Sequence, residues 1–281
     1  MEQVSHDQRA GLALNPDLVQ DMLVRFISDE TRSAGFTRGV VGLSGGVDSA
    51  LSAALTARAL GADQTVAVVM PYRESSKESV DDAKLVAKEL GIRAEIVDIS
   101  PMADAWFSAA GKPDKVRRGN VLARLRMIVL YDISARERAL VVGTSNKTEL
   151  LLGYGTLHGD MASAINPLGD LYKTQIWQLA KAMKLPDRVV TKKPTADLWA
   201  GQTDEGELGF SYERVDQLLY LMVDERRKEE ELLALGFERT FIRSVQEMIR
   251  KNQFKRRPPV IAKISYRTVN VDFRYVRDWG I

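Results

Sequence analysis

The chain is 281 residues long and 45% hydrophobic, which is enough for a large buried core formed by one domain with an appended helical part. Its 40 basic and 38 acidic residues leave a net charge of only +2, so no extended electrostatic field favours nucleic acid as a partner. The chain has no cysteine, and this excludes disulfides, thiolate metal sites and a cysteine nucleophile.

Short apolar runs alternate with helical patterns through the first half of the chain. A leading helix is predicted over residues 17–27 and an amphipathic helix over residues 121–131. Gly61 and Gly91 stand where helix C-caps are expected. Strands are predicted at residues 40–43, 65–70, 94–99 and 139–142. This alternation predicts an α/β fold, a doubly wound parallel sheet with helices on both faces.

The character of the chain changes to loops and helices after Gly153. Helices are predicted at residues 174–183, 212–223 and 230–235, whereas residues 263–281 have no clear period. We therefore expect a single domain over residues 1–281, with an α/β nucleotide-binding core at about 17–200 and a flap, a C-terminal helical extension and a tail at about 200–281. No signal pattern begins the chain and no apolar run approaches the roughly 20 residues that span a bilayer, so a cytoplasmic protein without a membrane partner is expected.

The heptapeptide SGGVDSA, residues 44–50, lies between the first predicted strand and a helical pattern. Its two glycines let the backbone approach an anion, and the following N–H groups would point outward from a helix N-terminus. Asp48 stands where a Walker A loop would need lysine, and a carboxylate beside an anion is explained if Mg²⁺ bridges it to phosphate. The alternative is a simple helix cap, with Ser44 or Ser49 as the capping residue. The whole heptapeptide favours a nucleotide site and resembles the signature of the ATP pyrophosphatases, which split ATP between the α and β phosphates.

A second polar group, GTSNKTEL at residues 143–150, follows the fourth predicted strand. No glycine precedes Lys147, so a Walker A loop is excluded, and the nearby GYG lacks the third glycine of a dinucleotide fingerprint. Ligands of open parallel sheets gather at the carboxyl ends of strands near the point where strand order reverses. Asp48 and Glu149 are therefore predicted to share one metal ion, although Glu149 taken alone is an ordinary first-turn helix acid.

Four sequence blocks in order resemble the ammonia-dependent NAD synthetases of the PP-loop superfamily, from about residue 17 to the C-terminal tail. The blocks are SGGVDSA, GTSNKTELLLGYGT, INPLGDLYKTQ and PTADLWAGQTDEGELGFSYE. The resemblance implies an adenine nucleotide alpha-hydrolase-like fold and a homodimer with sites shared across the interface. It also implies a ligase reaction, in which ATP adenylates the nicotinate carboxylate of deamido-NAD and ammonia then displaces AMP to give NAD.

The resemblance implies positions for Mg²⁺ and for ATP as co-substrate. Asp48 and Glu149 are the implied metal ligands, and Asp48, Lys173 and Thr195 are the implied catalytic residues. The implied ATP-binding residues are Gly42, Leu43, Ser44, Gly45, Gly46, Val47, Asp48, Ser49, Thr144, Lys173 and Thr195. Without the resemblance, Lys173 stands at a predicted helix start, where a cation opposes the helix dipole and therefore indicates a bound anion. The alternative reading of Lys173 is a surface lysine.

Deamido-NAD is expected to contact Arg124 and Lys255, positions that match the family, although Arg124 taken alone would be a solvated charge on its helix. Three positions at which better-known members carry polar residues are Leu157, Ala164 and Phe254. Each lost hydrogen bond costs about 1–3 kcal/mol when its partner stays buried, so other groups are expected to substitute. Asp160 is the predicted replacement, with His158 and Arg256 nearby, and Phe254 is kept in the substrate-binding set by its position.

The nitrogen is expected to come from free ammonia or a separate partner, because a glutaminase needs a cysteine nucleophile. Residues 199–207 combine glycines and acids and are predicted to form a flap that excludes water, the alternative being a plain surface loop. Two other functions stay open: an ATP pyrophosphatase that adenylates a different carboxylate or a nucleobase, and a nucleotide-binding regulatory protein without catalysis. The joint presence of Asp48, Glu149 and Lys173 favours an enzyme.

Overall fold

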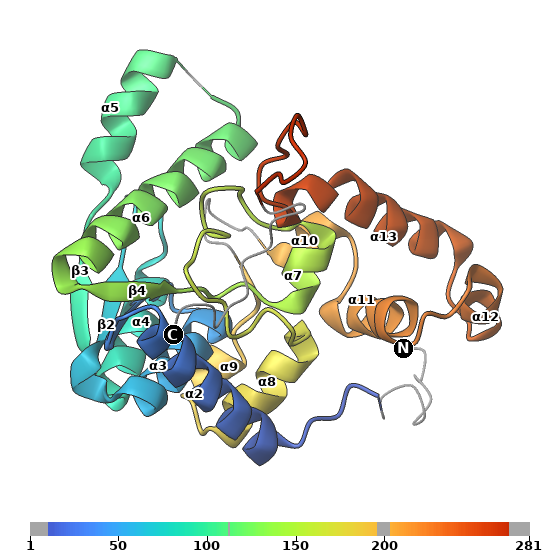
Figure 1. Cartoon of the computed structure of the whole chain (residues 1–281), viewed down its shortest axis with the longest axis horizontal. Helices are drawn as coiled ribbons and strands as arrows, with labels where there is room; N and C mark the ends of the chain where they lie inside the picture. The colour runs from blue at the N-terminus through green and yellow to red at the C-terminus, as the bar shows by residue number, and fades with distance from the viewer. Residues whose placement is uncertain (1–10, 112, 196–202, 270–281) are drawn as a thin grey trace.

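The computed structural model describes residues 11–111, 113–195 and 203–269, and a parallel sheet of four strands forms its centre (Figure 1). The strands are β1 (Arg38–Gly42), β2 (Thr65–Val69), β3 (Arg93–Ile96) and β4 (Ala139–Val142). Their order is β3-β2-β1-β4. The four predicted strands are confirmed, although β3 is shorter than expected. Because β1 lies between β2 and β4, the strand order reverses at β1, and the loops after β1 and β4 emerge side by side.

Helices cover both faces of the sheet, as the sequence predicts. Val41 and Val142 pack on the face that carries α2 (Pro16–Ser33), α3 (Val47–Leu60), α4 (Lys77–Glu89), α8 (Lys173–Ala182) and α9 (Asp187–Val190). Val40 and Val141 pack on the face that carries α5 (Ser100–Ala110) and α6 (Lys115–Glu137). Neighbouring side chains of a strand point to opposite faces, so strands that are apolar throughout need a helical layer on each side.

Glycines end two of these helices where the sequence places them. Gly61 is the C-cap of α3, and Gly91, with φ +65°, directly follows Leu90, the C-cap of α4. The short 3-10 helix η1 (Ala62–Gln64) then leads into β2.

The C-terminal half forms a third apolar cluster beside the sheet. Its elements are α7 (Lys147–Leu152), α10 (Asp204–Leu208), α11 (Tyr212–Leu219), the π-helix η2 (Tyr220–Asp224), α12 (Glu229–Ala234), α13 (Arg239–Lys251) and the 3-10 helix η3 (Gln253–Arg256). Helix α13 is absent from the sequence prediction, although its buried Ile242 and Val245 recur at helical spacing opposite its basic residues, which is the pattern of an amphipathic helix. No helix within the described ranges is long and apolar enough to cross a membrane.

Helix α13 and the segment after it are fixed to the end of α7. The side-chain amide of Asn252 donates to the carbonyl of Leu152 at 2.9 Å, and Arg256 donates to the carbonyls of Leu150 and Leu151 at 3.0 and 2.8 Å. These bonds satisfy carbonyls that the end of a helix leaves without partners. Arg256 therefore stabilises α7 in this structure.

The left-handed glycine after α7 gives a test of this packing. Gly153 (φ +68°) and Gly91 (φ +65°) have nearly the same backbone, but a Cβ at Gly153 would lie 2.1 Å from the Cβ of Asn252, whereas one at Gly91 would meet nothing within 4 Å. We expect Gly91→Ala to lower the free energy of unfolding by about 1 kcal/mol and Gly153→Ala by about 3 kcal/mol or more. Urea denaturation measures both, and equal losses would contradict the close packing of Asn252 on Gly153.

Candidate active site

The turn after β1 forms an open phosphate loop. Helix α3 begins at Val47 with Gly46 as its N-cap, and no side chain caps it. The Ser49 hydroxyl instead donates to the Gly46 carbonyl at 2.9 Å and accepts from the backbone N–H of Ser44 at 3.2 Å. The alternative in which Ser44 or Ser49 caps the helix is therefore wrong. The first N–H groups of α3 are available to an anion, as the helix dipole favours.

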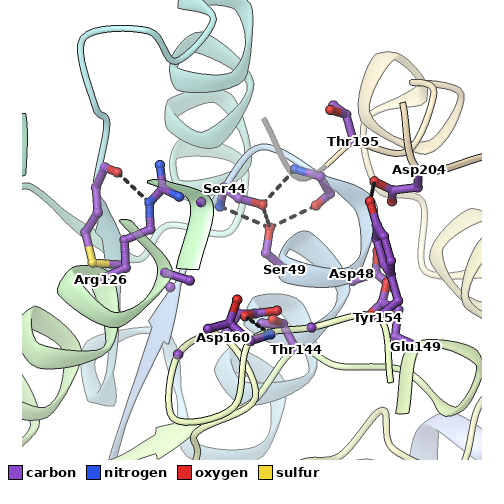
Figure 2. Close-up of a pocket in the computed structure, with 18 of the residues that line it drawn as sticks. Ser44, Asp48, Ser49, Arg126, Thr144, Glu149, Tyr154, Asp160, Thr195 and Asp204 are labelled. Atoms are coloured by element: carbon purple, nitrogen blue, oxygen red, sulfur yellow. Dashed lines mark hydrogen bonds between the residues drawn. The ribbon is translucent and has the colours of Figure 1, made fainter. Parts of the chain in front are cut away.

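A pocket of about 490 Å³ opens at the carboxyl ends of β1 and β4. The predicted ATP-binding residues line it, including Thr144 and Thr195, with the exception of Gly45. Gly45 (φ +82°) packs instead against α4, where a Cβ would lie 2.2 Å from the Ser79 carbonyl oxygen. Figure 2 shows Asp48, Glu149, Tyr154 and Asp204 gathered on one side of the pocket and Arg126 on the other. The prediction that the loops after the first and fourth strands face one crevice is confirmed.

Lys173 joins the two predicted metal ligands. It is the first residue of α8 and is 2% exposed, and its ammonium contacts Asp48 and lies 3.7 Å from Glu149 Oε1. Burial lowers the pKa of Lys173, but the charges of Asp48 and then Glu149 outweigh it, so the pKa lies above its ordinary value. Lys173 is therefore a charged group in the pocket wall, and the reading of it as a surface lysine is wrong.

Glu149 has two roles in the local structure. Its carboxylate accepts from the backbone N–H of Asn146 at 3.3 Å, and the Asn146 side chain accepts from the N–H of Glu149, which completes a capping box at the start of α7. Asn146 also donates to Asp48 Oδ1 at 2.9 Å. Burial and the nearby charge of Asp48 raise the pKa of Glu149 to about 8, against the opposing charge of Lys173. The reading of Glu149 as a first-turn helix acid is confirmed, and its role as a metal ligand stays a prediction.

The Asp48 and Glu149 carboxylates both lie beside the Lys173 ammonium, in a pocket with a phosphate loop, so they are close enough together to face one divalent cation. Within the described ranges no group of three or more histidine, cysteine, aspartate or glutamate side chains is arranged to hold a metal. Mg²⁺ commonly binds one or two carboxylates together with substrate phosphates and water. The two carboxylates are therefore suited to a cation that arrives with a nucleotide.

Two tyrosines and an aspartate close this side of the pocket. The Tyr154 hydroxyl lies 3.0 Å from Asp204 and 2.7 Å from Glu207, and the Tyr212 hydroxyl lies 3.2 Å from Asp204. The Tyr212 ring faces the Lys173 ammonium at 5.3 Å. Burial raises the pKa of Asp204, which Lys173 and the tyrosine hydrogen bonds partly offset. Sequence reasoning missed these contacts because Tyr154 and Lys173 stand far along the chain from Asp204 and Tyr212.

A buried carboxylate behind the site holds the start of α8 in place. Asp216 on α11 accepts from the Thr148 hydroxyl at 2.6 Å and from the backbone N–H of Thr174 at 2.8 Å. Thr148 in turn accepts from the backbone N–H of Lys173 at 3.0 Å. Burial raises the pKa of Asp216 to about 6, although these hydrogen bonds oppose the shift. These contacts fix Lys173 through its backbone. No local sequence signal indicated the role of Asp216.

Asp160 and Lys255 lie together at the pocket, as predicted. Asp160 Oδ1 accepts from the backbone N–H of Thr156 at 2.8 Å, and Lys255 donates to the carbonyls of Gly153 and Gly155 at 2.7 and 2.9 Å. The Asp160 side chain reaches solvent, yet loss of water from the carboxyl group where the protein packs around it raises its pKa. The hydrogen bonds from Thr156 and the charge of Lys255 lower the pKa and partly offset this effect. Both residues thus shape the loop as well as the pocket.

Arg124 and Phe254 lie outside the lining of this pocket. Arg124 is exposed on α6 and donates to the Leu157 carbonyl at 3.2 Å, and Phe254 is 60% exposed. Within a single copy of the chain these two residues do not reach the pocket. Their part in substrate binding stays a prediction. Of the predicted flap, residues 199–202 lie outside the described residues, and Thr203 caps α10 by accepting from Gly206 N–H.

Fold and site together define an α/β protein of the PP-loop type. A family model described as NAD synthase matches residues 19–259. The NH(3)-dependent NAD(+) synthetase of Chlorobium phaeobacteroides (strain BS1) is 55% identical over 95% of this chain and 97% of its own. The chain therefore belongs to the NAD synthase family and, within it, to the ammonia-dependent NAD synthetases, which are ligases.

Two solved structures show the same fold. The NH3-dependent NAD synthetase from Campylobacter jejuni, in complex with the nitrate ion, has a TM-score of 0.77 and 35% identity over 89% of this chain and 100% of that one. The NMN synthetase from Francisella tularensis has a TM-score of 0.80 and 30% identity over 89% of this chain and 99% of that one.

The raised pKa of Glu149 predicts a trade-off between stability and function. A carboxyl whose folded pKa of about 8 exceeds its unfolded value of about 4.3 binds more protons in the folded state, so the folded protein loses stability as pH rises between the two values. We expect Glu149→Gln, which keeps the capping box, to raise the free energy of unfolding of metal-free protein by about 1–2 kcal/mol at pH 9 and to leave it unchanged near pH 4.

Urea denaturation in the presence of a chelator measures this difference. Glu78→Gln, in the exposed first turn of α4, is the control and should give no pH-dependent gain. A Glu149→Gln curve that follows the wild type at every pH would show that Glu149 is not held beside Asp48.

Proposed function

We propose that this pocket binds ATP, deamido-NAD and ammonia and forms NAD, AMP and pyrophosphate. The observation that carries the proposal is the buried Lys173 ammonium beside Asp48 and Glu149, next to an uncapped phosphate loop. A protein that only binds a nucleotide has little need for a carboxylate pair and a lysine beside the reacting phosphate. The names of the relatives supply the substrate class.

The chemistry needs alignment and charge neutralisation more than an activated side chain. The nicotinate carboxylate is already ionised at neutral pH, so it can attack the α-phosphate once the two are held in line. Lys173 places positive charge where the pyrophosphate departs, and the N–H groups at the start of α3 bind its oxygens. Asp48 and Glu149 would hold Mg²⁺, which neutralises phosphate charge when bound.

The second step needs ammonia and a dry pocket. Ammonia attacks the acyl adenylate and AMP leaves, whereas water at the same carbon would waste the activated carboxyl. The Tyr154, Asp204 and Tyr212 contacts close the pocket beside Lys173, and we assign the water-excluding role to them together with the flap that follows Thr195.

We propose further that the enzyme is a homodimer in the cytoplasm, where ATP is available. Arg124, Ile128 and Tyr131 form an exposed stripe at helical spacing on α6, and exposed apolar side chains of this kind mark interaction surfaces. A second copy packed there would place Arg124 at a shared boundary between sites. Lys251, Lys255, Arg256 and Arg257 form a basic cluster near the C-terminus, but Lys255 and Arg256 are bonded to backbone carbonyls, which disfavours this cluster as a nucleic-acid surface.

The direct test combines purified protein with ATP, Mg²⁺, ammonium and deamido-NAD. We expect NAD and pyrophosphate in equal amounts, a rate that rises toward pH 8 at fixed total ammonium, and no use of glutamine. Asp48→Asn should lower turnover at least about 100-fold, and Lys173→Ala should lower turnover more than ATP affinity. Asp63→Asn, on the exposed η1, is the matched control.

Three outcomes would count against the proposal. Wild-type turnover of Asp48→Asn at saturating Mg²⁺ would remove the metal assignment. Efficient use of glutamine by protein free of glutaminase would remove the ammonia dependence. Faster amidation of nicotinic acid mononucleotide than of deamido-NAD would favour a second candidate function, the synthesis of NMN. The likeness to the NMN synthetase and the apolar Leu157 and Ala164 support that candidate.

A separate pair of variants tests whether Asp160 recognises deamido-NAD. Asp160→Asn keeps an acceptor for the Thr156 N–H and removes only the charge, so we expect the Michaelis constant for deamido-NAD to rise about tenfold while Tm stays unchanged. Asp160→Ala should raise the Michaelis constant and also lower Tm, because the loop loses its hydrogen bond. An unchanged Michaelis constant in Asp160→Asn would leave Asp160 with a structural role alone.

A further inference from the structure

A second buried ion-pair network lies beside the phosphate loop, on the side of the pocket formed by α4. Its centre is Asp82, which is 1% exposed. Arg188 Nη2 lies 2.5 Å from Asp82 Oδ1, and Lys192 Nζ lies 2.8 Å from Asp82 Oδ2. The network joins Asp82 on α4 to Arg188 in α9 and to Lys192, which follows α9.

The contacts of Lys192 place its ammonium next to the phosphate loop. Lys192 Nζ lies 3.1 Å from the Ser79 hydroxyl, and Ser79 is the residue whose carbonyl packs against Gly45. Lys192 and Ser79 both line the same pocket as the loop residues. A cation is thus held at the wall of the pocket by a residue that touches the loop itself.

The charges and hydrogen-bond donors of this network indicate that the Lys192 ammonium can bind a further, anionic group. The ammonium of a lysine has three N–H donors, and Asp82 and Ser79 account for two of them among the described residues. Arg188, whose side chain is 53% exposed, already balances the charge of Asp82 from the outer side. The three side chains together therefore carry one net positive charge, and Lys192 presents it at the pocket.

We propose that Lys192 binds the terminal phosphates of ATP, and the pyrophosphate that leaves, and that Asp82 is the residue that positions it. Lys173 and the carboxylate pair lie at the α-phosphate, where the carboxylate attacks and the bond to pyrophosphate breaks, and Lys192 lies at the terminal phosphates. Anchoring by Asp82 and Ser79 removes most of the side-chain freedom that a lysine otherwise loses on binding. This inference rests on the proposed function, because it assumes an ATP site.

The experiment measures binding of three probes by calorimetry: ATP, inorganic pyrophosphate and AMP, each with Mg²⁺. For Lys192→Met we expect the dissociation constants of ATP and pyrophosphate to rise about tenfold or more and that of AMP to change less than about twofold, since AMP lacks the terminal phosphates. Lys192→Arg should restore part of the affinity. Asp81→Asn, the exposed neighbour of Asp82 on α4, is the control and should bind all three probes like the wild type.

A double-variant comparison tests the positioning role. If Asp82 acts through Lys192, Asp82→Asn should weaken pyrophosphate binding, and Asp82→Asn combined with Lys192→Met should bind it no more weakly than Lys192→Met alone. Melting curves establish that each variant is folded. Should Asp82→Asn fail to fold, Lys192→Met and Lys192→Arg still decide the phosphate contact.

Two results would overturn the inference. Unchanged pyrophosphate affinity in folded Lys192→Met would leave Lys192 as a link between α4 and α9 only. An equal loss of AMP affinity in Lys192→Met would show that Lys192 contacts the α-phosphate and not the terminal phosphates. Failure of the wild type to bind ATP at all is a different result, because it would refute the proposed function itself.

Discussion

The contact between Lys173 and Asp48 is the interaction on which the site depends. A charged lysine that is 2% exposed is tolerated only because carboxylates surround it, since an unpaired buried charge costs far more than a paired one. The pair joins the loop after β1 to the start of α8, two segments that are far apart in the sequence. The phosphate loop, Glu149 and the two tyrosines, Tyr154 and Tyr212, are all arranged around this pair.

The fold holds this ion pair by means that have little to do with local propensity. Asp216 fixes the first turn of α8, and Asn146 holds both Asp48 and the start of α7. Each is a buried polar group with its partners supplied by other elements, as a low-dielectric interior requires. The C-terminal helices, which contribute Asp216, are therefore part of the site as well as a covering layer.

The carboxylates beside Lys173 also show how stability and activity compete. Burial, together with the nearby charge of Asp48, raises the pKa of Glu149 to about 8. A protein selected for stability alone would not place two acids there, whereas a cation that arrives with a nucleotide needs both.

The sequence by itself determined the alternation of strands and helices and the phosphate loop, because strand periodicity and adjacent glycines are local properties. It also predicted the pairing of Asp48 with Glu149, because that alternation indicates a parallel sheet, in which the carboxyl ends of the strands lie at one edge. The prediction left out α13, although its apolar stripe at helical spacing is a local signal, and the sequence could not show that Arg124 and Phe254 lie outside the pocket of one chain. Tertiary structure alone decided the roles of Tyr154, Asp204 and Lys192. Their meaning comes from neighbours far away in the chain, and spacing along a sequence carries no information about which distant side chains share a buried charge.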